Sequence, residues 1–225
     1  MPKGIVLLSG GLDSTLTLAK LAEYDEVVPM FVNYNQWPLI PEKEAVDSIC
    51  RFLGCQDPVV AGMQIEGDIN QIGSVWGRSI AMLGVASMWA YTHGDDYSYI
   101  ALGSHEGDVG PDCKPGDFDY WMGKALNSAT KNKMDIKLPI ADYTIEDIGR
   151  ELAEYTIPFE LTYSCYWFPP CGYKSVNEEY RCPGCRRKAI AMRSAGITDE
   201  NFLDFPNGNL RGRTYQSSMA VPAGY

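Results

Sequence analysis

Basic charge and long apolar runs are what this sequence most lacks. It carries 19 lysines and arginines against 29 aspartates and glutamates, which gives a formal net charge of −10 at pH 7. Proteins that grip a nucleic acid normally present a basic face, so this balance counts against direct nucleic-acid binding and favours a small-molecule substrate. No uninterrupted apolar run approaches the roughly 20 residues that a membrane span needs, so we expect no membrane partner.

The sequence also lacks an export signal and the cysteine pattern of a disulfide framework. Residues 1–4 lead directly into an apolar run and leave no room for a signal peptide, so we expect a cytoplasmic protein. There are seven cysteines, and an odd number without an export signal favours metal binding or reactive thiols over disulfides.

What the sequence does have is a regular alternation of short β-branched runs and helix-compatible stretches. The expected strands cover residues 4–8, 26–34, 58–61, 97–103 and 134–138, and the expected helices cover residues 15–24, 42–53, 79–93, 117–130 and 144–155. This alternation predicts an α/β fold with a doubly wound, Rossmann-like parallel sheet. In such a sheet the ligand lies beyond the carboxyl ends of the strands.

The hexapeptide Ser9-Gly10-Gly11-Leu12-Asp13-Ser14 lies between the first expected strand and the first expected helix. A strand that turns through glycines into a helix exposes backbone N–H groups and the positive end of the helix dipole, which bind anions. No Lys-Ser/Thr follows the glycines and the Gly-x-Gly-x-x-Gly spacing is missing, which excludes the two standard phosphate loops. The alternative is a simple turn in which Ser14 or Asp13 caps the helix.

A cysteine cluster near the C-terminus has the spacing of a metal site: Cys165-x5-Cys171-x10-Cys182-x2-Cys185. Four thiolates predict a closed, structural zinc site with a net charge of about −2. Basic residues able to offset that charge follow or flank the last pair, with a helix expected to start near Cys185: Arg181, Arg186, Arg187 and Lys188. A redox Cys-x-x-Cys pair and buried unliganded cysteines remain alternatives. We therefore predict a nucleotide-binding domain over residues 1–156 and a small C-terminal zinc-binding region and tail over residues 157–225.

Residues 9–14 resemble the pyrophosphate (PP) loop, Ser-Gly-Gly-x-Asp-Ser, of the N-type ATP pyrophosphatases, which use ATP to adenylate a carbonyl oxygen. Loop and cysteine cluster together, in this order, resemble the 7-cyano-7-deazaguanine synthase family. Further similar segments are Val75–Arg78 before an apolar helix and Gly103–Cys113, which ends in Pro-Asp-Cys. The resemblance extends from about residue 4 to residue 195.

The resemblance implies a fold of the adenine nucleotide alpha hydrolase type and a ligase that makes 7-cyano-7-deazaguanine in queuosine-type biosynthesis. Its substrates would be 7-carboxy-7-deazaguanine, ammonia and ATP, its metals Mg²⁺ and a structural Zn²⁺, and its assembly a homodimer. An adenylated carboxylate and an amide would be intermediates. No glutaminase domain is visible, so ammonia would come from solution or from a partner protein.

The resemblance to this family also predicts the residues of the site. The predicted catalytic residues are Asp13, Ser14 and Arg78. ATP would be held by Ser9, Gly10, Gly11, Asp13, Ser14, Asn35, Gln36 and Gly103, with Asp13 orienting magnesium or capping the helix. The deazapurine would be held by Arg78, Asp112 and Cys113, and Arg78 suits a phosphate or the substrate carboxylate because its fork matches planar oxyanions.

The sequence departs from the family mainly where the deazapurine would be recognised. The segment between Gln36 and Gly77 is short, Ser79 replaces an asparagine, and Gly110 stands where tyrosine is usual. Alternatives therefore stay open: a relative that stops at the amide or couples the activated deazaguanine to another amine such as a protein, a transfer-RNA-modifying enzyme, or a non-enzymatic zinc module.

Overall fold

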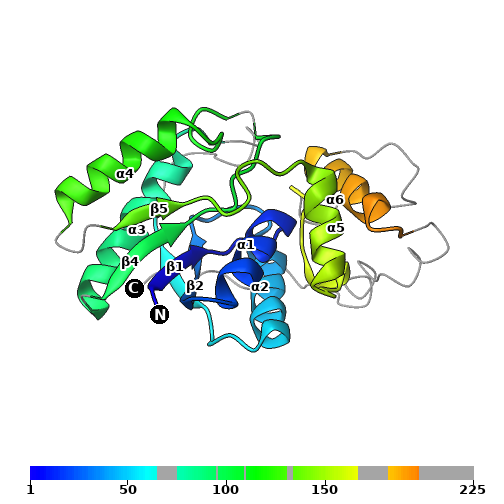
Figure 1. Cartoon of the computed structure of the whole chain (residues 1–225), viewed down its shortest axis with the longest axis horizontal. Coiled ribbons are helices and arrows are strands. Elements are labelled where there is room, and N and C mark those ends of the chain that lie inside the picture. Colours follow the sequence, from blue (N-terminus) through cyan, green and yellow to red (C-terminus); the bar gives the residue numbers. More distant parts are fainter. Residues whose placement is uncertain (65–74, 95, 109, 131–133, 167–181, 198–225) are drawn as a thin grey trace.

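The structure, a computed structural model, describes residues 1–64, 75–94, 96–108, 110–130, 134–166 and 182–197 (Figure 1). Its strands are β1 (Lys3–Leu7), β2 (Glu26–Asn33), β3 (Val59–Gly62), β4 (Tyr97–Ala101) and β5 (Asp135–Lys137). Its α-helices are α1 (Leu12–Ala22), α2 (Leu39–Leu53), α3 (Arg78–His93), α4 (Asp117–Ala129), α5 (Ile145–Glu154) and α6 (Pro183–Ser194), with a 3-10 turn at Phe159–Leu161. The predicted strands and helices are all present within a few residues of their expected bounds.

The five strands form one parallel sheet in the order β3-β2-β1-β4-β5. Alternate side chains of β1 point to opposite faces: Val6 packs with α1 and α2, whereas Ile5 packs with α3 and α4. The sheet is therefore covered on both sides, as its nearly continuous apolar strands require. This arrangement confirms the predicted doubly wound α/β fold.

A third core cluster joins the C-terminal part of the chain to the first helix. Leu16 of α1, Ile148 of α5 and Met192 of α6 belong to this one cluster, and all three are at most 1% exposed. In Figure 1, α5 and α6 lie side by side next to α1. The division at residue 156 stays a prediction, but the described residues on either side of it share a core. Among those residues, no helix has the length and apolarity that crossing a membrane would take.

The start of α1 differs from the expectation. The helix begins at Leu12, three residues earlier than predicted, because Gly11 takes an extended backbone and forms the N-cap. No side chain caps the helix, and Asp13 and Ser14 lie inside its first turn. The prediction that either residue caps α1 is wrong, and the first-turn N–H groups have no partner within the helix.

Candidate functional site

Three loops meet at the carboxyl ends of β1, β2 and β4, as the strand order requires. In the first loop, the two serine hydroxyls lie 3.1 Å apart, and the Ser9 N–H donates to Ser14 Oγ at 3.2 Å. Ser14 Oγ also donates to the Gly11 carbonyl at 3.3 Å. These bonds hold the turn open toward the helix N-terminus, so the loop has the geometry of an anion site.

Two glycines allow the backbone segments of this site to approach closely. Gly10 has φ +80°, and a Cβ there would lie 2.8 Å from the Glu42 carbonyl oxygen at the start of α2. A Cβ on Gly103 would lie 2.7 Å from the Ser14 nitrogen. The loop after β4 therefore rests directly on the first turn of α1, which explains why both positions are glycine.

We expect Gly103→Ala to destabilise the fold by about 1–3 kcal/mol and to weaken nucleotide binding, because the added methyl must push β4 away from α1. Thermal and urea unfolding, with ATP titration, would measure both effects. Gly84→Ala is the matched control: a Cβ there meets nothing within 4 Å on α3, so it should stabilise by about 0.5–1 kcal/mol. Equal stability of Gly103→Ala and the unmodified protein would contradict the close packing.

A charged cluster surrounds Asp13. Arg187, on α6, donates through Nη2 to Asp13 Oδ2 at 3.0 Å, and its Nη1 lies 3.6 Å from Asp108 Oδ1. The same guanidinium contacts His105 Nε2. Asp13 Oδ1 is buried and has no hydrogen-bond partner among the described residues. Burial raises the pKa of the Asp13 carboxyl, and the positive charge of Arg187 opposes that rise.

His105 is 1% exposed, and both of its ring nitrogens contact neighbouring groups. Nε2 contacts the Arg187 guanidinium. Nδ1 accepts the Gly107 N–H at 3.1 Å and lies 3.2 Å from the Tyr143 carbonyl oxygen. The imidazole thus links Arg187 to the segment before α5, and the Asp108 carboxylate accepts the His105 backbone N–H at 3.1 Å.

A second polar group lies at the end of β2. Arg78 donates to the Tyr34 hydroxyl at 3.1 Å. Gln36 is 6% exposed; its Oε1 accepts the Tyr34 N–H, and its Nε2 donates to Glu42 at 2.9 Å. The Gln36 amide therefore holds the turn, while Asn35 is exposed in the left-handed region with φ 62°. The nucleotide-binding roles of Asn35 and Gln36, and the catalytic role of Arg78, stay predictions.

Glu42, which accepts a hydrogen bond from Gln36, should make the stability of the protein depend on pH. Burial raises the pKa of its carboxyl to about 7, although Gln36 and Arg78 favour the charged form. The folded protein therefore holds a proton that the unfolded chain releases from about pH 4.5. The free energy of unfolding should fall as pH rises from 4.5 to 7, by on the order of 3 kcal/mol.

Glu42→Gln keeps an acceptor for Gln36 and removes the titration. Urea unfolding of both proteins from pH 4.5 to 8 should give similar stabilities at the acid end and a more stable variant at pH 8. Parallel stability curves would contradict the raised pKa.

Two of the three residues expected to hold the deazapurine, Asp112 and Cys113, lie in the loop after β4. Asp112 is 8% exposed, and its Oδ2 accepts the Ser79 N–H at 3.1 Å, so the carboxylate pairs with the first turn of α3. Cys113 Sγ donates to the Gly110 carbonyl at 3.5 Å, and burial raises the pKa of the thiol. Neither a substrate contact nor an activated thiolate follows from these positions, and their substrate roles stay predictions.

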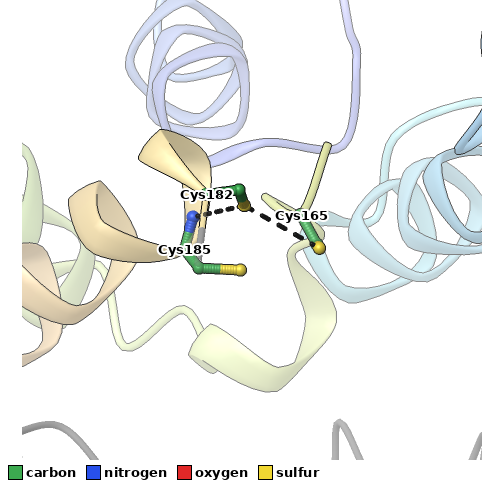
Figure 2. Close-up of side chains that lie close together, drawn as sticks. All are labelled: Cys165, Cys182 and Cys185. Atoms are coloured by element: carbon green, nitrogen blue, oxygen red, sulfur yellow. Dashed lines mark hydrogen bonds between the residues drawn. The ribbon is translucent and has the colours of Figure 1, made fainter. Parts of the chain in front are cut away.

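Three of the four predicted metal ligands converge beside this site. Cys165, Cys182 and Cys185 are at most 3% exposed, and their sulfurs all lie within 4.8 Å of one another (Figure 2). Two of the sulfurs, those of Cys165 and Cys182, are 3.9 Å apart, close to the about 3.8 Å between thiolates on one tetrahedral zinc ion. The donor set therefore fits zinc. Cys171 lies outside the described residues.

Helix α6 starts within this thiol cluster. Cys182 is the N-cap, and its sulfur accepts the Cys185 N–H at 3.4 Å. Hydrogen bonds with Cys165 and then Cys185 hold the pKa of the Cys182 thiol well below its usual range. Negative charge at this cluster is therefore favoured, as metal binding requires.

The basic residues near the thiol cluster do not all offset its negative charge. Lys188 is 2% exposed; burial lowers its pKa to about 8, and the negative charge of Cys185 opposes that change. Its Nζ donates to the Thr162 carbonyl oxygen at 2.7 Å. Arg186 is exposed and Arg181 lies outside the described residues. Arg187 turns to Asp13 rather than to the thiols, so the prediction that it offsets their charge is wrong.

The cysteine region also touches the loop through its backbone. The Tyr163 N–H, two residues before Cys165, donates to the Gly10 carbonyl oxygen at 2.8 Å. Arg187, two residues after Cys185, reaches Asp13. Sequence reasoning missed both contacts, together with the part that His105 and Asp108 take in the charged cluster. The alternation of strands and helices placed the loop that carries these two residues at the strand ends, but it gave no indication that they meet Arg187.

The strand order and the turn at the end of β1, followed by the uncapped start of α1, define a doubly wound α/β protein with the geometry of an anion site at its strand ends. A protein-family model described as "Queuosine biosynthesis protein QueC" matches the chain over residues 3–73 and 59–196. The chain belongs to this family.

Relatives support the same assignment. The 7-cyano-7-deazaguanine synthase of Nautilia profundicola is 30% identical over 227 residues, covering 88% of this chain and 97% of that protein. The protein of the same name from Methanocaldococcus jannaschii is 30% identical over 237 residues, with 88% and 97% covered. These two relatives confirm the family resemblance seen in the sequence. Among solved structures, the U34-tRNA thiolase NcsA of Methanococcus maripaludis aligns with a TM-score of 0.46 at 15% identity, covering 92% of this chain and 68% of that chain, and the assignment does not rest on it.

Proposed function

We propose that the protein is an ATP-dependent carbon–nitrogen ligase that converts 7-carboxy-7-deazaguanine and ammonia to 7-cyano-7-deazaguanine. The observation that carries the proposal is the Ser9–Ser14 loop at the strand ends, in a chain whose relatives are named for this product. It places uncapped N–H groups of α1 and two hydroxyls around one anion site.

The chemistry asked of such a site is mainly positioning. A carboxylate oxygen of the substrate attacks the α-phosphorus of ATP, and pyrophosphate leaves with the bonding electron pair. Ammonia then displaces AMP, which leaves with the labile oxygen, and loss of a proton gives the amide. The amide oxygen attacks a second ATP in the same way, and the nitrile forms as the C–O bond breaks, AMP leaves with that oxygen and the nitrogen loses its protons. Gly10, Gly11, Ser9 and Ser14 hold the departing pyrophosphate through N–H and O–H donors, which stabilises the charge that builds on it.

Asp13 and Arg78 would help to neutralise the charges of the substrates, Asp13 through a magnesium ion and Arg78 directly. The buried Asp13 Oδ1, without a partner among the described residues, is suited to orient a magnesium ion, which would reduce the charge of the triphosphate. Arg78, partly buried at the end of β2 with Tyr34, is suited to the substrate carboxylate. The deazapurine would lie between these residues and the loop that carries Asp112 and Cys113.

Zinc would have a structural part. The Cys165, Cys182 and Cys185 thiols, with Cys171 as fourth ligand, would form a closed site that leaves no position for water. Such a site fixes Tyr163 against Gly10 and the start of α6 against α1. Loss of zinc would therefore disturb the Ser9–Ser14 loop, although none of the cysteine ligands takes part in the reaction.

The assembly proposed is a homodimer in the cytoplasm, acting on a small molecule and not on nucleic acid. Helix α3 supports an interface, because Ile80, Met88 and Tyr91 are about half exposed or more and recur at helical spacing along one face. Trp121 of α4 adds a further exposed aromatic ring.

Incubation with ATP, Mg²⁺, ammonium and 7-carboxy-7-deazaguanine tests the function, with products followed by mass spectrometry. Nitrile formation with matching AMP and pyrophosphate is expected. Amide as the final product would favour a relative that stops one step early or uses another amine. AMP without any change of the base would contradict the proposed substrate.

A further inference from the structure

Arg187 lies at the strand ends and contacts several charged and polar side chains with one guanidinium. It comes from α6, far along the chain, and its side chain is 31% exposed. Its guanidinium faces two carboxylates, Asp13 and Asp108, and the imidazole of His105. Three side chains from two other parts of the chain therefore surround one guanidinium at the anion-binding loop.

The position of Arg187 matches what a phosphate group at this loop would need. An anion held by the first-turn N–H groups of α1 lies beside Asp13, the second residue of that helix. Arg187 Nη2 already lies 3.0 Å from Asp13 Oδ2. A guanidinium carries five donors in a planar fork, so it can bind phosphate oxygens while keeping its bonds to Asp108 and His105.

A simple tether between α6 and α1 does not explain the cluster. A tether needs only one partner, whereas the partly buried Arg187 guanidinium contacts Asp13, Asp108 and His105. Instead, Asp13 leaves Oδ1 buried without a partner among the described residues, which is unfavourable in the absence of a ligand. A site that binds a charged ligand accounts both for the several contacts of Arg187 and for the Asp13 Oδ1 left unpaired among the described residues, because the ligand would supply the missing partner.

We propose that Arg187 is a phosphate-binding residue of the nucleotide site, and that Asp108 and His105 are positioning residues that aim it. This inference rests on the proposed function and deepens it. In the activation step, a bond forms between the substrate oxygen and the α-phosphorus while the bond to the bridging oxygen breaks. The electron pair stays on pyrophosphate, no proton moves, and Arg187 neutralises part of the charge that builds there.

The test compares ligands with and without phosphates. Equilibrium dialysis with labelled ATP, inorganic pyrophosphate and adenosine would be run on Arg187→Gln, Arg187→Lys and the unmodified full chain with Mg²⁺. We expect Arg187→Gln to weaken binding of ATP and pyrophosphate by about 30-fold and that of adenosine by less than 2-fold. Arg187→Lys keeps the charge but not the fork, so we expect an intermediate loss of roughly 5-fold for the phosphate ligands.

Arg150→Gln is the matched control, because it removes an arginine that pairs with Asp147 on the surface of α5 at 54% exposure. It should change none of the three affinities. Zinc content and the thermal midpoint, measured on every variant, report whether α6 stays in place. If Arg187→Gln fails to fold, Arg187→Lys provides the test. It must still weaken the binding of ATP and pyrophosphate while leaving the binding of adenosine unchanged.

Two results would overturn the inference while leaving the proposed function intact. One is unchanged pyrophosphate binding by Arg187→Gln in a chain that still forms the nitrile. The other is an equal loss of adenosine and ATP binding, which would make Arg187 a structural tether only. If the unmodified chain binds no ATP, both this inference and the proposed function are wrong.

Discussion

Replacing Asp13 with asparagine is expected to lower the rate of nitrile formation by about 10³-fold, with little loss of stability. The substitution keeps the shape of the side chain and removes its charge. It would take away the carboxylate that faces Arg187 and the buried oxygen proposed to orient magnesium. Losing a preorganised charge at a site of this kind typically costs 10²–10³-fold, and here two functions depend on one carboxylate.

Steady-state rates and thermal unfolding of Asp13→Asn would be measured side by side. The thermal midpoint should stay the same or rise, because burial of the charge is unfavourable in the absence of ligand. Asp96→Asn is the control: Asp96 pairs with Lys3 at the amino end of the sheet and is 63% exposed. That variant should retain full activity, whereas full activity of Asp13→Asn would refute the assigned role of the loop.

Removing the proposed zinc site is expected to have the second largest effect. Cys182 both caps α6 and belongs to the thiol cluster, so Cys182→Ser should release the metal and loosen the start of α6. Because metal binding at structural zinc sites is coupled to folding, we expect a loss of at least about 3 kcal/mol, or roughly 6–12 °C in thermal midpoint. ATP affinity should fall in parallel, since Arg187 and Tyr163 would no longer be held at the loop.

Metal analysis and calorimetry, with and without a chelator, would measure these changes. Cys55→Ser is the control, because Cys55 follows α2 and lies outside the thiol cluster. It should keep one zinc per chain and nearly all of the stability. Anaerobically purified protein that contains no zinc, or that responds to reductant rather than to chelator, would instead favour the redox interpretation of the cysteines.

The sheet could be predicted because its strands are short apolar runs separated by helices of ordinary length. The start of α1 could not, because it depends on the extended backbone of Gly11, and a glycine permits several conformations. The convergence of Cys165 with the Cys182–Cys185 pair followed from spacing, since two residues between thiolates suit one ion.

The direction of Arg187 is the clearest case of what the sequence did not indicate. Its neighbours in the chain are a predicted metal ligand and other basic residues, which suggested charge compensation of the thiolates. Its real partners depend on how α6 packs against α5 and α1, a tertiary contact of distant segments. The same is true of His105, whose ring lies beside Arg187 and beside the Tyr143 carbonyl oxygen before α5.

An isotope measurement tests most directly the claim that this chain activates its substrate by adenylation at the loop. The substrate would be 7-carboxy-7-deazaguanine with oxygen-18 in its carboxylate, supplied with ATP, Mg²⁺ and ammonium. Each activation should transfer one labelled oxygen to AMP, so the label should leave the base entirely in AMP as the nitrile forms, with unlabelled pyrophosphate. Label in inorganic phosphate, or release of ADP in place of AMP, would contradict the account.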